Sequence, residues 1–118
     1  MTRKEFEEKA GLNISIKNDT EQKNLEKVKR DGNAIYYIKN PSEAVKLEAV
    51  KQDGWVIEYI KNPSEEVQLA AIKRTVGAIR FIENPSEAVQ LQAVKQDDYA
   101  IEFIKNPSEA VRLESIKQ

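Results

Sequence analysis

The sequence predicts an all-α fold: an α-solenoid of tandem 22-residue helix-turn-helix repeats that form a short right-handed superhelix. Three observations predict it. The motif Asn-Pro-Ser-Glu begins at Asn40, Asn62, Asn84 and Asn106, always 22 residues apart. Apolar residues follow each copy at helical spacing, and residues that favour helix starts and turns separate the apolar segments. At 118 residues the chain has the length of one domain.

The first helix of each repeat is predicted from its start and stop residues. In the repeat that begins at Asn40, we expect Asn40 to be the N-cap and Pro41 to take the first helical position. Glu43 then stands at the third helical position, where it completes a capping box with Asn40. Gly54 suits a left-handed residue after the helix. The first helix is therefore predicted over 41–52.

A second, shorter helix is predicted over 55–61. Val56, Ile57 and Ile60 share one face of this segment. A buried strand is the alternative interpretation of such a short apolar run. The segment lacks strict alternation of apolar and polar residues, so we favour the helix.

The predicted core consists of apolar positions that recur in every copy. They are Ile35, Ile57, Ile79 and Ile101; Ile38, Ile60, Ile82 and Ile104; Val45, Val67, Val89 and Val111; and Leu47, Leu69, Leu91 and Leu113. A set that repeats in this way is typical of stacked units, architecturally HEAT-like, that bury a continuous core only between neighbours.

The two ends of the chain differ from its middle. The predicted segments of the single domain 1–118 are an N-terminal capping helix and linker (1–15), a degenerate first repeat (16–37), full repeats (38–59, 60–81 and 82–103) and a truncated last repeat (104–118). Lys23 and Lys27 give the degenerate repeat a more polar face. The last repeat has no second helix, which predicts exposed apolar surface and a homodimer through that end. In the third repeat, Gly77 is expected to take the left-handed turn in place of Val76.

Composition excludes several classes of function. The formal net charge is −1, with 19 basic and 20 acidic residues, and so lacks the basic excess of a simple nucleic-acid or membrane binder. The chain has no Cys, so it lacks a thiolate nucleophile or thiolate metal ligand, and it has no His, the commonest general base and metal ligand. We expect no enzymatic activity, no cofactor and no bound metal. With no apolar leader or long apolar segment, the expected location is cytoplasmic, in a bacterial cell or in the host cytoplasm if the gene is phage-encoded.

Two repeated polar patterns have structural explanations. The Ser and Glu of Asn-Pro-Ser-Glu recur at predicted helix starts, and Ser42 has no His to activate it, so capping is favoured over a catalytic role. Asp31, Asp53 and Asp97 occupy equivalent turns. Helices pack about 10 Å apart, which spreads these carboxylates too widely for one metal ion and favours turn chemistry.

The repeats resemble a known family. Leu69-Ala-Ala-Ile72 followed by Asn84-Pro-Ser-Glu87, at a 22-residue step, is similar to the Leu-Ala-Ala-Val and Asn-Pro repeats of a bacterial and viral domain of unknown function. The resemblance covers residues 16–118. It implies helical repeats and occurrence in bacteria, phages or large viruses. It implies no activity and supplies no catalytic residues.

The positions that vary between copies are the candidates for binding. A constant scaffold with variable exposed residues is how repeat proteins present a binding surface, and aromatic and Arg residues anchor interfaces. The candidate partner-binding residues are Tyr36, Trp55, Glu58, Arg74, Arg80, Tyr99 and Glu102. For Trp55, covering the neighbouring helix is an equally good explanation. A lysine also recurs once per repeat, as Lys29, Lys51, Lys73, Lys95 and Lys117; it can follow a nucleic-acid backbone or stabilise a helix C-terminus.

The leading hypothesis is therefore a non-enzymatic macromolecule-binding repeat protein, a protein–protein interaction module. A sharper form, based on the family resemblance alone, is an inhibitor from a phage or mobile element that occludes a bacterial defence enzyme such as an RNA-guided nuclease. The alternative is nucleic-acid-backbone binding along the lysine stripe. Salt dependence distinguishes protein from nucleic-acid binding.

Overall fold

The computed structural model describes residues 20–117, and every element in this range is helical. The chain forms a helix over 20–30 and then alternates between short 3-10 helices (η) and α-helices. These are η1 (Gly32–Tyr37), α2 (Glu43–Gln52), η2 (Gly54–Tyr59), α3 (Glu65–Arg74), η3 (Val76–Phe81), α4 (Glu87–Gln96), η4 (Asp98–Phe103) and α5 (Glu109–Lys117). The predicted all-α class is confirmed for this range, which contains no strand. The predicted segment 1–15 and the start of the degenerate repeat lie outside the described residues.

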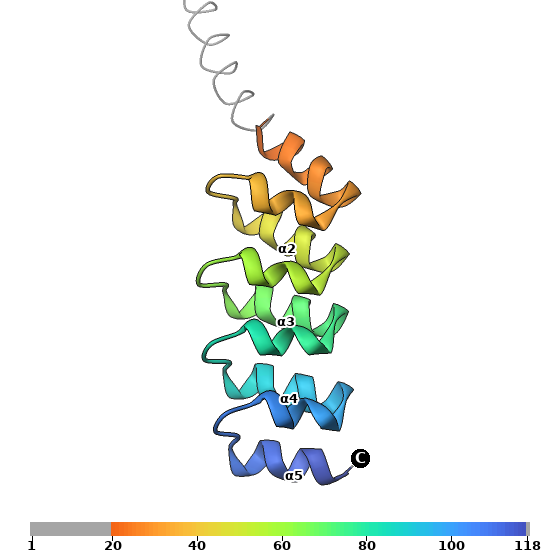
Figure 1. Ribbon diagram of the computed structural model, residues 1–118, viewed down its shortest axis with the longest axis vertical. Helices are drawn as coiled ribbons and strands as arrows, with labels where there is room; N and C mark the ends of the chain where they lie inside the picture. The colour runs from red at the N-terminus through yellow and green to blue at the C-terminus, as the bar shows by residue number, and fades with distance from the viewer. Residues whose placement is uncertain (1–19, 118) are drawn as a thin grey trace, which may run out of the picture.

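The elements stack in chain order along one axis (Figure 1). Each labelled α-helix contacts the next α-helix, and each 3-10 helix contacts the next 3-10 helix. The remaining contacts join an α-helix to the 3-10 helices before and after it, and no labelled element contacts one further along the stack. The molecule therefore has an α column and a 3-10 column, with the core between them.

The α-helices begin two residues later than predicted. In α2 the N-cap is Ser42, whose Oγ accepts the N–H of Val45 at 3.3 Å. The prediction of Asn40 as the N-cap, with Pro41 in the helix, is wrong: Asn40 has a φ of 52°, in the left-handed region. A residue before proline is disfavoured in the α conformation, and Asn tolerates the left-handed one. Asn40 therefore turns the chain, and the Ser42 hydroxyl caps the helix.

The capping-box prediction for Glu43 is also wrong, because Glu43 is the first helical residue and not the third. Its carboxylate instead accepts a hydrogen bond of 2.5 Å from the Ser64 hydroxyl of the following repeat. The same bond recurs at each junction: Ser42 to Glu21 (2.7 Å), Ser86 to Glu65 (2.5 Å) and Ser108 to Glu87 (3.2 Å). We call this series the Ser–Glu ladder. The constant motif thus combines a helix cap with a bond between repeats.

Glycine has a different role at the end of each helix from the one predicted. Asp53, in extended backbone, is the C-cap of α2, and the described glycines all lack a positive φ, so the left-handed role predicted for Gly54 and Gly77 is wrong. A Cβ on Gly54 would lie 2.5 Å from the Ala71 carbonyl oxygen. Glycine is present because the end of the next α-helix comes too close for a side chain. A Cβ on Gly77 would lie 2.7 Å from the Trp55 ring.

The second helix of each repeat is confirmed as helical, but it is a 3-10 helix that begins at Gly54 in the second repeat. The Asp53 carboxylate accepts the Trp55 N–H at 3.0 Å, and the Ile60 N–H closes the last turn on Ile57. Asp31 and Asp97 cap η1 and η4 in the same way. Six residues are too few for a stable α-helix but suffice for a capped 3-10 segment.

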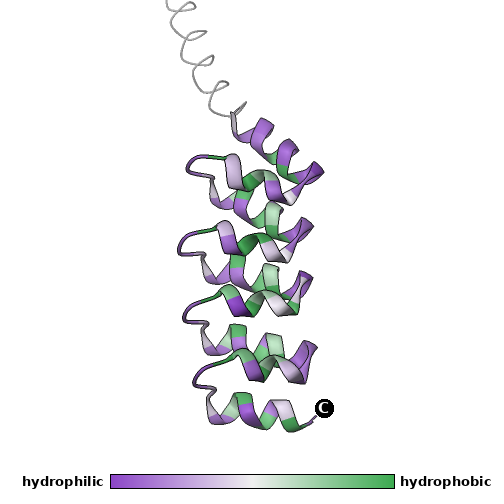
Figure 2. Ribbon diagram, in the orientation of Figure 1, coloured by the Kyte–Doolittle hydropathy of each residue, from purple (hydrophilic) through white to green (hydrophobic). Residues whose placement is uncertain are grey.

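The core is a continuous line of small apolar side chains that follows the stack. Val67, Ala71 and Ile72 of α3 are fully buried, as are their counterparts in α2 and α4. Each buried valine or isoleucine side chain contributes roughly 1.5–3 kcal/mol. In Figure 2 the helices carry both apolar (green) and polar (purple) colour, and the loops that lead into the α-helices are mainly polar. Among the described residues, no polar or charged residue is buried.

The repeated leucines are not central core residues, contrary to expectation. Leu47, Leu69 and Leu91 are only partly buried and pack against the edge of the core. In α5, which has no α-helix after it among the described residues, the equivalent Leu113 is 50% exposed. In α2, α3 and α4 the true core positions are the residues two before and two and three after the leucine. The leucines line the outer side of the α column, where they cover the seam between neighbours.

This difference predicts a stability order among three substitutions in α3. Ile72→Ala leaves a cavity in the core and is expected to lower the free energy of unfolding by about 2–5 kcal/mol. Leu69→Ala removes a partly buried side chain and should cost about 1 kcal/mol, while exposed Lys73→Ala should cost less than about 0.5 kcal/mol. Urea unfolding of the three variants measures the order. A cost for Leu69→Ala equal to that for Ile72→Ala would show that the leucines belong to the core.

The Ser–Glu ladder predicts energetic coupling between adjacent repeats. Ser86→Ala removes both the α4 cap and the bond to Glu65, so it should cost about 1–2 kcal/mol. Glu65→Ala removes only the bond between repeats and should cost less. In a double-mutant cycle, the two effects should be non-additive by about 0.5 kcal/mol or more. Additive effects would show that the ladder contributes nothing to stacking.

Candidate functional site

Six of the seven predicted partner-binding residues lie on the 3-10 column and are exposed. They are Tyr36, Trp55, Glu58, Arg80, Tyr99 and Glu102. The seventh, Arg74, lies at the end of α3, where its Nε donates to the Gln52 carbonyl at 3.2 Å. The structure therefore brings the variable residues of η1 to η4 onto one side of the stack and places Arg74 on the α-helices.

Sequence analysis missed an aromatic stripe on the same column. Tyr37, Tyr59, Phe81 and Phe103 are the last residues of η1 to η4, and they are between 41% and 85% exposed. Their spacing is again 22 residues, so the register that revealed the core could have revealed them too. We call these four residues, together with Tyr36 and Trp55, the aromatic ridge.

Contacts across the junctions hold the ridge together. Tyr36 meets Tyr59 of the next repeat edge-to-face, with 5.0 Å between ring centroids. Trp55 meets Phe81 in the same way at 5.9 Å. The Arg80 guanidinium lies 4.6 Å from the Phe103 centroid and 5.9 Å from the centroid of Trp55. Such pairs each add about 0.5–1.5 kcal/mol beyond the burial of apolar area.

Trp55 combines packing with exposure. Its ring lies where a side chain on Gly77 would be, yet the residue remains 43% exposed. The glycine of the third repeat makes room for the indole of the second. One part of the ring therefore covers the neighbouring repeat, as one interpretation of Trp55 predicts, and another part meets solvent and stays a candidate for binding. Loss of the indole should affect stability as well as any binding.

Beside the ridge, grooves of similar composition open at three successive junctions, where the 3-10 helices lead into the α-helices. Their volumes are about 400, 550 and 310 Å³ in chain order. Each is lined by a ridge aromatic (Tyr59, Phe81 or Phe103), by isoleucines, by Asn and Pro of the loop, and by Lys46, Gln68 or Gln90 of the α-helix. We call them the junction grooves.

The lysine stripe lies on the α-helices and is exposed at Lys29, Lys51, Lys73, Lys95 and Lys117. From Lys51 onward, each lysine stands in the last turn of its α-helix, where a cation favours the helix dipole. Lys51, Lys73 and Arg74 line a groove of about 540 Å³ over Leu47 and Leu69, and Glu66 lies in the same lining. The stripe is thus a mixed apolar and charged surface.

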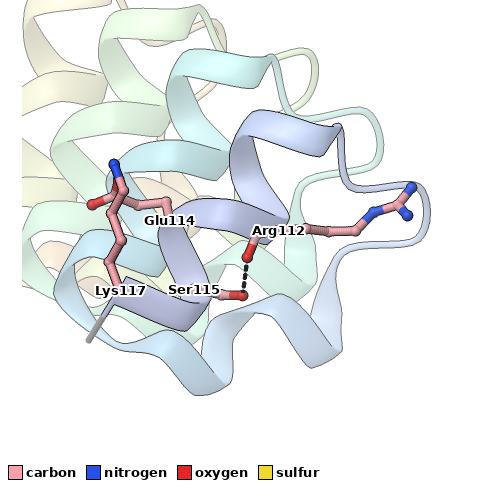
Figure 3. Close-up of polar contacts among 4 residues, drawn as sticks. All are labelled: Arg112, Glu114, Ser115 and Lys117. Atoms are coloured by element: carbon pink, nitrogen blue, oxygen red, sulfur yellow. Dashed lines mark hydrogen bonds and ion pairs between the residues drawn. The ribbon is translucent and has the colours of Figure 1, made fainter.

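The last described helix, α5, exposes apolar side chains. Ile116 is 73% exposed and Leu113 50% exposed. Polar contacts are local to the helix: Ser115 Oγ donates to the Arg112 carbonyl at 2.7 Å, and Lys117 pairs with Glu114 at 3.7 Å (Figure 3). Both apolar side chains are available for contact with another molecule.

The side chains between residues 20 and 117 were compared with two kinds of site, a metal centre and an activated serine. No group of three or more acidic side chains there could hold a metal ion. Each motif serine donates to a carboxylate and accepts a backbone N–H, so its hydroxyl is already engaged. The described helices include none with the length and apolar character needed to cross a bilayer.

Comparisons with family models, with curated proteins and with solved structures give no match. The resemblance of the 22-residue repeats to a bacterial and viral family therefore stays a prediction.

Proposed function

We propose that this protein is a non-enzymatic binding module, a short α-solenoid that recognises a protein partner through its aromatic ridge. The observation that carries the proposal is the ridge itself. Four 3-10 helices place large aromatic side chains, partly exposed, on one side of the stack. Exposed apolar patches of this kind mark interaction sites, and Tyr, Trp and Arg dominate binding energy at interfaces.

Pre-organisation supports this role. Tyr59 and Phe81 are each held by an aromatic side chain of the preceding repeat, and Phe103 by Arg80. Rings that are already fixed lose little conformational freedom when a partner covers them. Glu58, Arg80 and Glu102 lie exposed beside the rings and supply the polar rim that protein interfaces usually have.

The lysine stripe supports a second candidate, binding to a nucleic-acid backbone. Lys51, Lys73 and Arg74 converge on one groove of the α column. The Glu66 carboxylate in that groove repels a polyanion, and the leucine side chains of the groove cannot bind a phosphate. Protein binding is therefore the stronger proposal, while a steep loss of affinity with added salt would identify the second.

Three finer predictions from the sequence remain proposals. They are a right-handed HEAT-like superhelix, a cytoplasmic location, and occlusion of a bacterial defence enzyme such as an RNA-guided nuclease. A homodimer through α5 is a further proposal, supported by the exposed Leu113 and Ile116. The aromatic ridge supports protein binding independently of these four proposals.

The test is capture of a partner from bacterial lysate, followed by calorimetry with substituted proteins. Tyr59→Ala and Phe81→Ala should each weaken partner binding by about 2 kcal/mol if they are hot spots. Lys51→Ala and Lys73→Ala are matched controls on the α column and should leave affinity unchanged. Urea midpoints of all four variants separate binding from folding. Affinity that depends on the lysines and not on the aromatics would overturn the proposal.

A further inference from the structure

The junction grooves form a periodic series, and their period restricts what can fill them. Three successive junctions carry grooves built from residues at equivalent positions 22 apart in sequence. Phe81 and Ile82 line both the second groove and the third, so these two grooves adjoin. A ligand that uses the whole series must therefore be elongated and follow the stack. The identity of such a ligand rests on the proposed protein-binding function.

The distance between grooves matches one regular peptide conformation. Adjacent packed helices lie about 8–10 Å apart, which sets the step from one groove to the next. A polyproline II segment rises about 3.1 Å per residue with three residues per turn, so every third side chain returns to one face after about 9.3 Å. A β-strand places side chains on one face about 6.6 Å apart and soon falls out of register. Aromatic-lined grooves are also the surfaces on which polyproline II segments dock.

The charges of the groove linings select an acidic ligand. Lys46 and Lys61 line the first groove, Lys61 and Glu83 the second, and Arg80, Glu83 and Lys105 the third. Four different cations thus face a single carboxylate, although the whole chain has a net charge of −1. Across the described residues, none of these four cations has a carboxylate within ion-pair distance. Unpaired cations beside apolar pockets are complementary to carboxylates placed between apolar side chains.

Glutamine side chains are fixed in the walls of two grooves. Gln90 Nε2 donates to the Pro85 carbonyl at 2.9 Å in the third groove. Gln68 of the second groove donates to the Pro63 carbonyl in the same way. The backbone of a polyproline II segment makes no internal hydrogen bonds, so its N–H and C=O groups remain free to bond to polar groups of such walls.

We propose that the junction grooves bind an acidic, extended segment of the partner protein in the polyproline II conformation. One apolar side chain of the segment enters each groove, at every third residue. Carboxylates between these side chains pair with Lys46, Lys61, Arg80 and Lys105. The aromatic ridge forms the wall of the binding surface, and the Ser–Glu ladder keeps the grooves in register.

The experiment uses three labelled synthetic peptides of about twelve residues, titrated into the full chain and followed by fluorescence anisotropy. The first repeats Leu-Pro-Glu, the second has the same composition with leucine at alternate positions, and the third repeats Leu-Pro-Lys. The first should bind at least about tenfold more tightly than the other two, because it alone matches both period and charge. Equal binding of the first two peptides would contradict the proposed spacing of apolar side chains at every third residue. Equal binding of the first and third would contradict the proposed preference for an acidic segment.

Substituted proteins place the peptide on the grooves. The double variant Lys61→Glu, Lys105→Glu should weaken binding of the Leu-Pro-Glu peptide at least about tenfold. Lys51→Glu, Lys73→Glu is the matched control on the α column, with the same change in net charge, and should behave as wild type. Equal losses for both double variants would show that only overall charge matters and would overturn the site.

The captured partner separates this inference from the function on which it rests. Binding of the partner that depends on Tyr59 and Phe81 but survives Lys61→Glu, Lys105→Glu would leave the proposed function standing and overturn the acidic segment. If Tyr59→Ala and Phe81→Ala leave the affinity for the partner unchanged, the proposed function itself is contradicted.

Discussion

The structure depends on one constraint: a single repeat is too small to bury its own apolar surface. Each unit provides one ten-residue α-helix and one six-residue 3-10 helix. Val67, Ala71 and Ile72 reach complete burial because neighbouring helices cover them on both sides. The core therefore lies between repeats as much as within them. Stability must come from repetition, and any side chain that disturbs the step between repeats also disturbs the core.

Polar groups at the edges of the stack set that step. The motif serine caps its own helix and donates to the glutamate of the preceding repeat, so each helix start is tied to another. At the opposite end of the helix, Gly54 allows the Ala71 carbonyl to approach closely. Neither device uses the outer surface of the 3-10 column. The aromatic ridge and the junction grooves occupy that surface.

The sequence was sufficient for the helical class, the period and half of the buried positions among the described residues, because burial in a stack repeats with the chain. It was insufficient where a contact with a residue of another repeat determines the local structure. Asn40 and Ser42 are both good caps on local grounds, and the glutamate of the preceding repeat favours the serine. Gly54 suggested a left-handed turn. Glycine is instead needed there because the Ala71 carbonyl lies close to it, a contact that the local sequence does not reveal. The leucines have the spacing of core residues but face outward at the seam.

The candidate site was predictable in part. Six of the seven variable positions lie on the 3-10 column, whereas Arg74 lies at the C-terminal end of an α-helix. The stripe of Tyr37, Tyr59, Phe81 and Phe103 was missed because constancy was equated with core and variation with binding. Here a position that is always aromatic, Tyr in two repeats and Phe in two, is exposed, and it forms the wall of the repeated grooves.

Deletion of one whole repeat tests the central claim most directly. Removing residues 82–103 joins Phe81 to Ile104, keeps Gly77 beside the Trp55 ring, and leaves the remaining caps and core positions in register. The shortened protein should unfold cooperatively in urea with a helical circular dichroism spectrum and a lower midpoint, because it loses one interface between neighbours. Removing only the second half of that segment breaks the register and should abolish folding. Loss of the fold after the whole-repeat deletion, or its survival after the half-repeat deletion, would contradict the account.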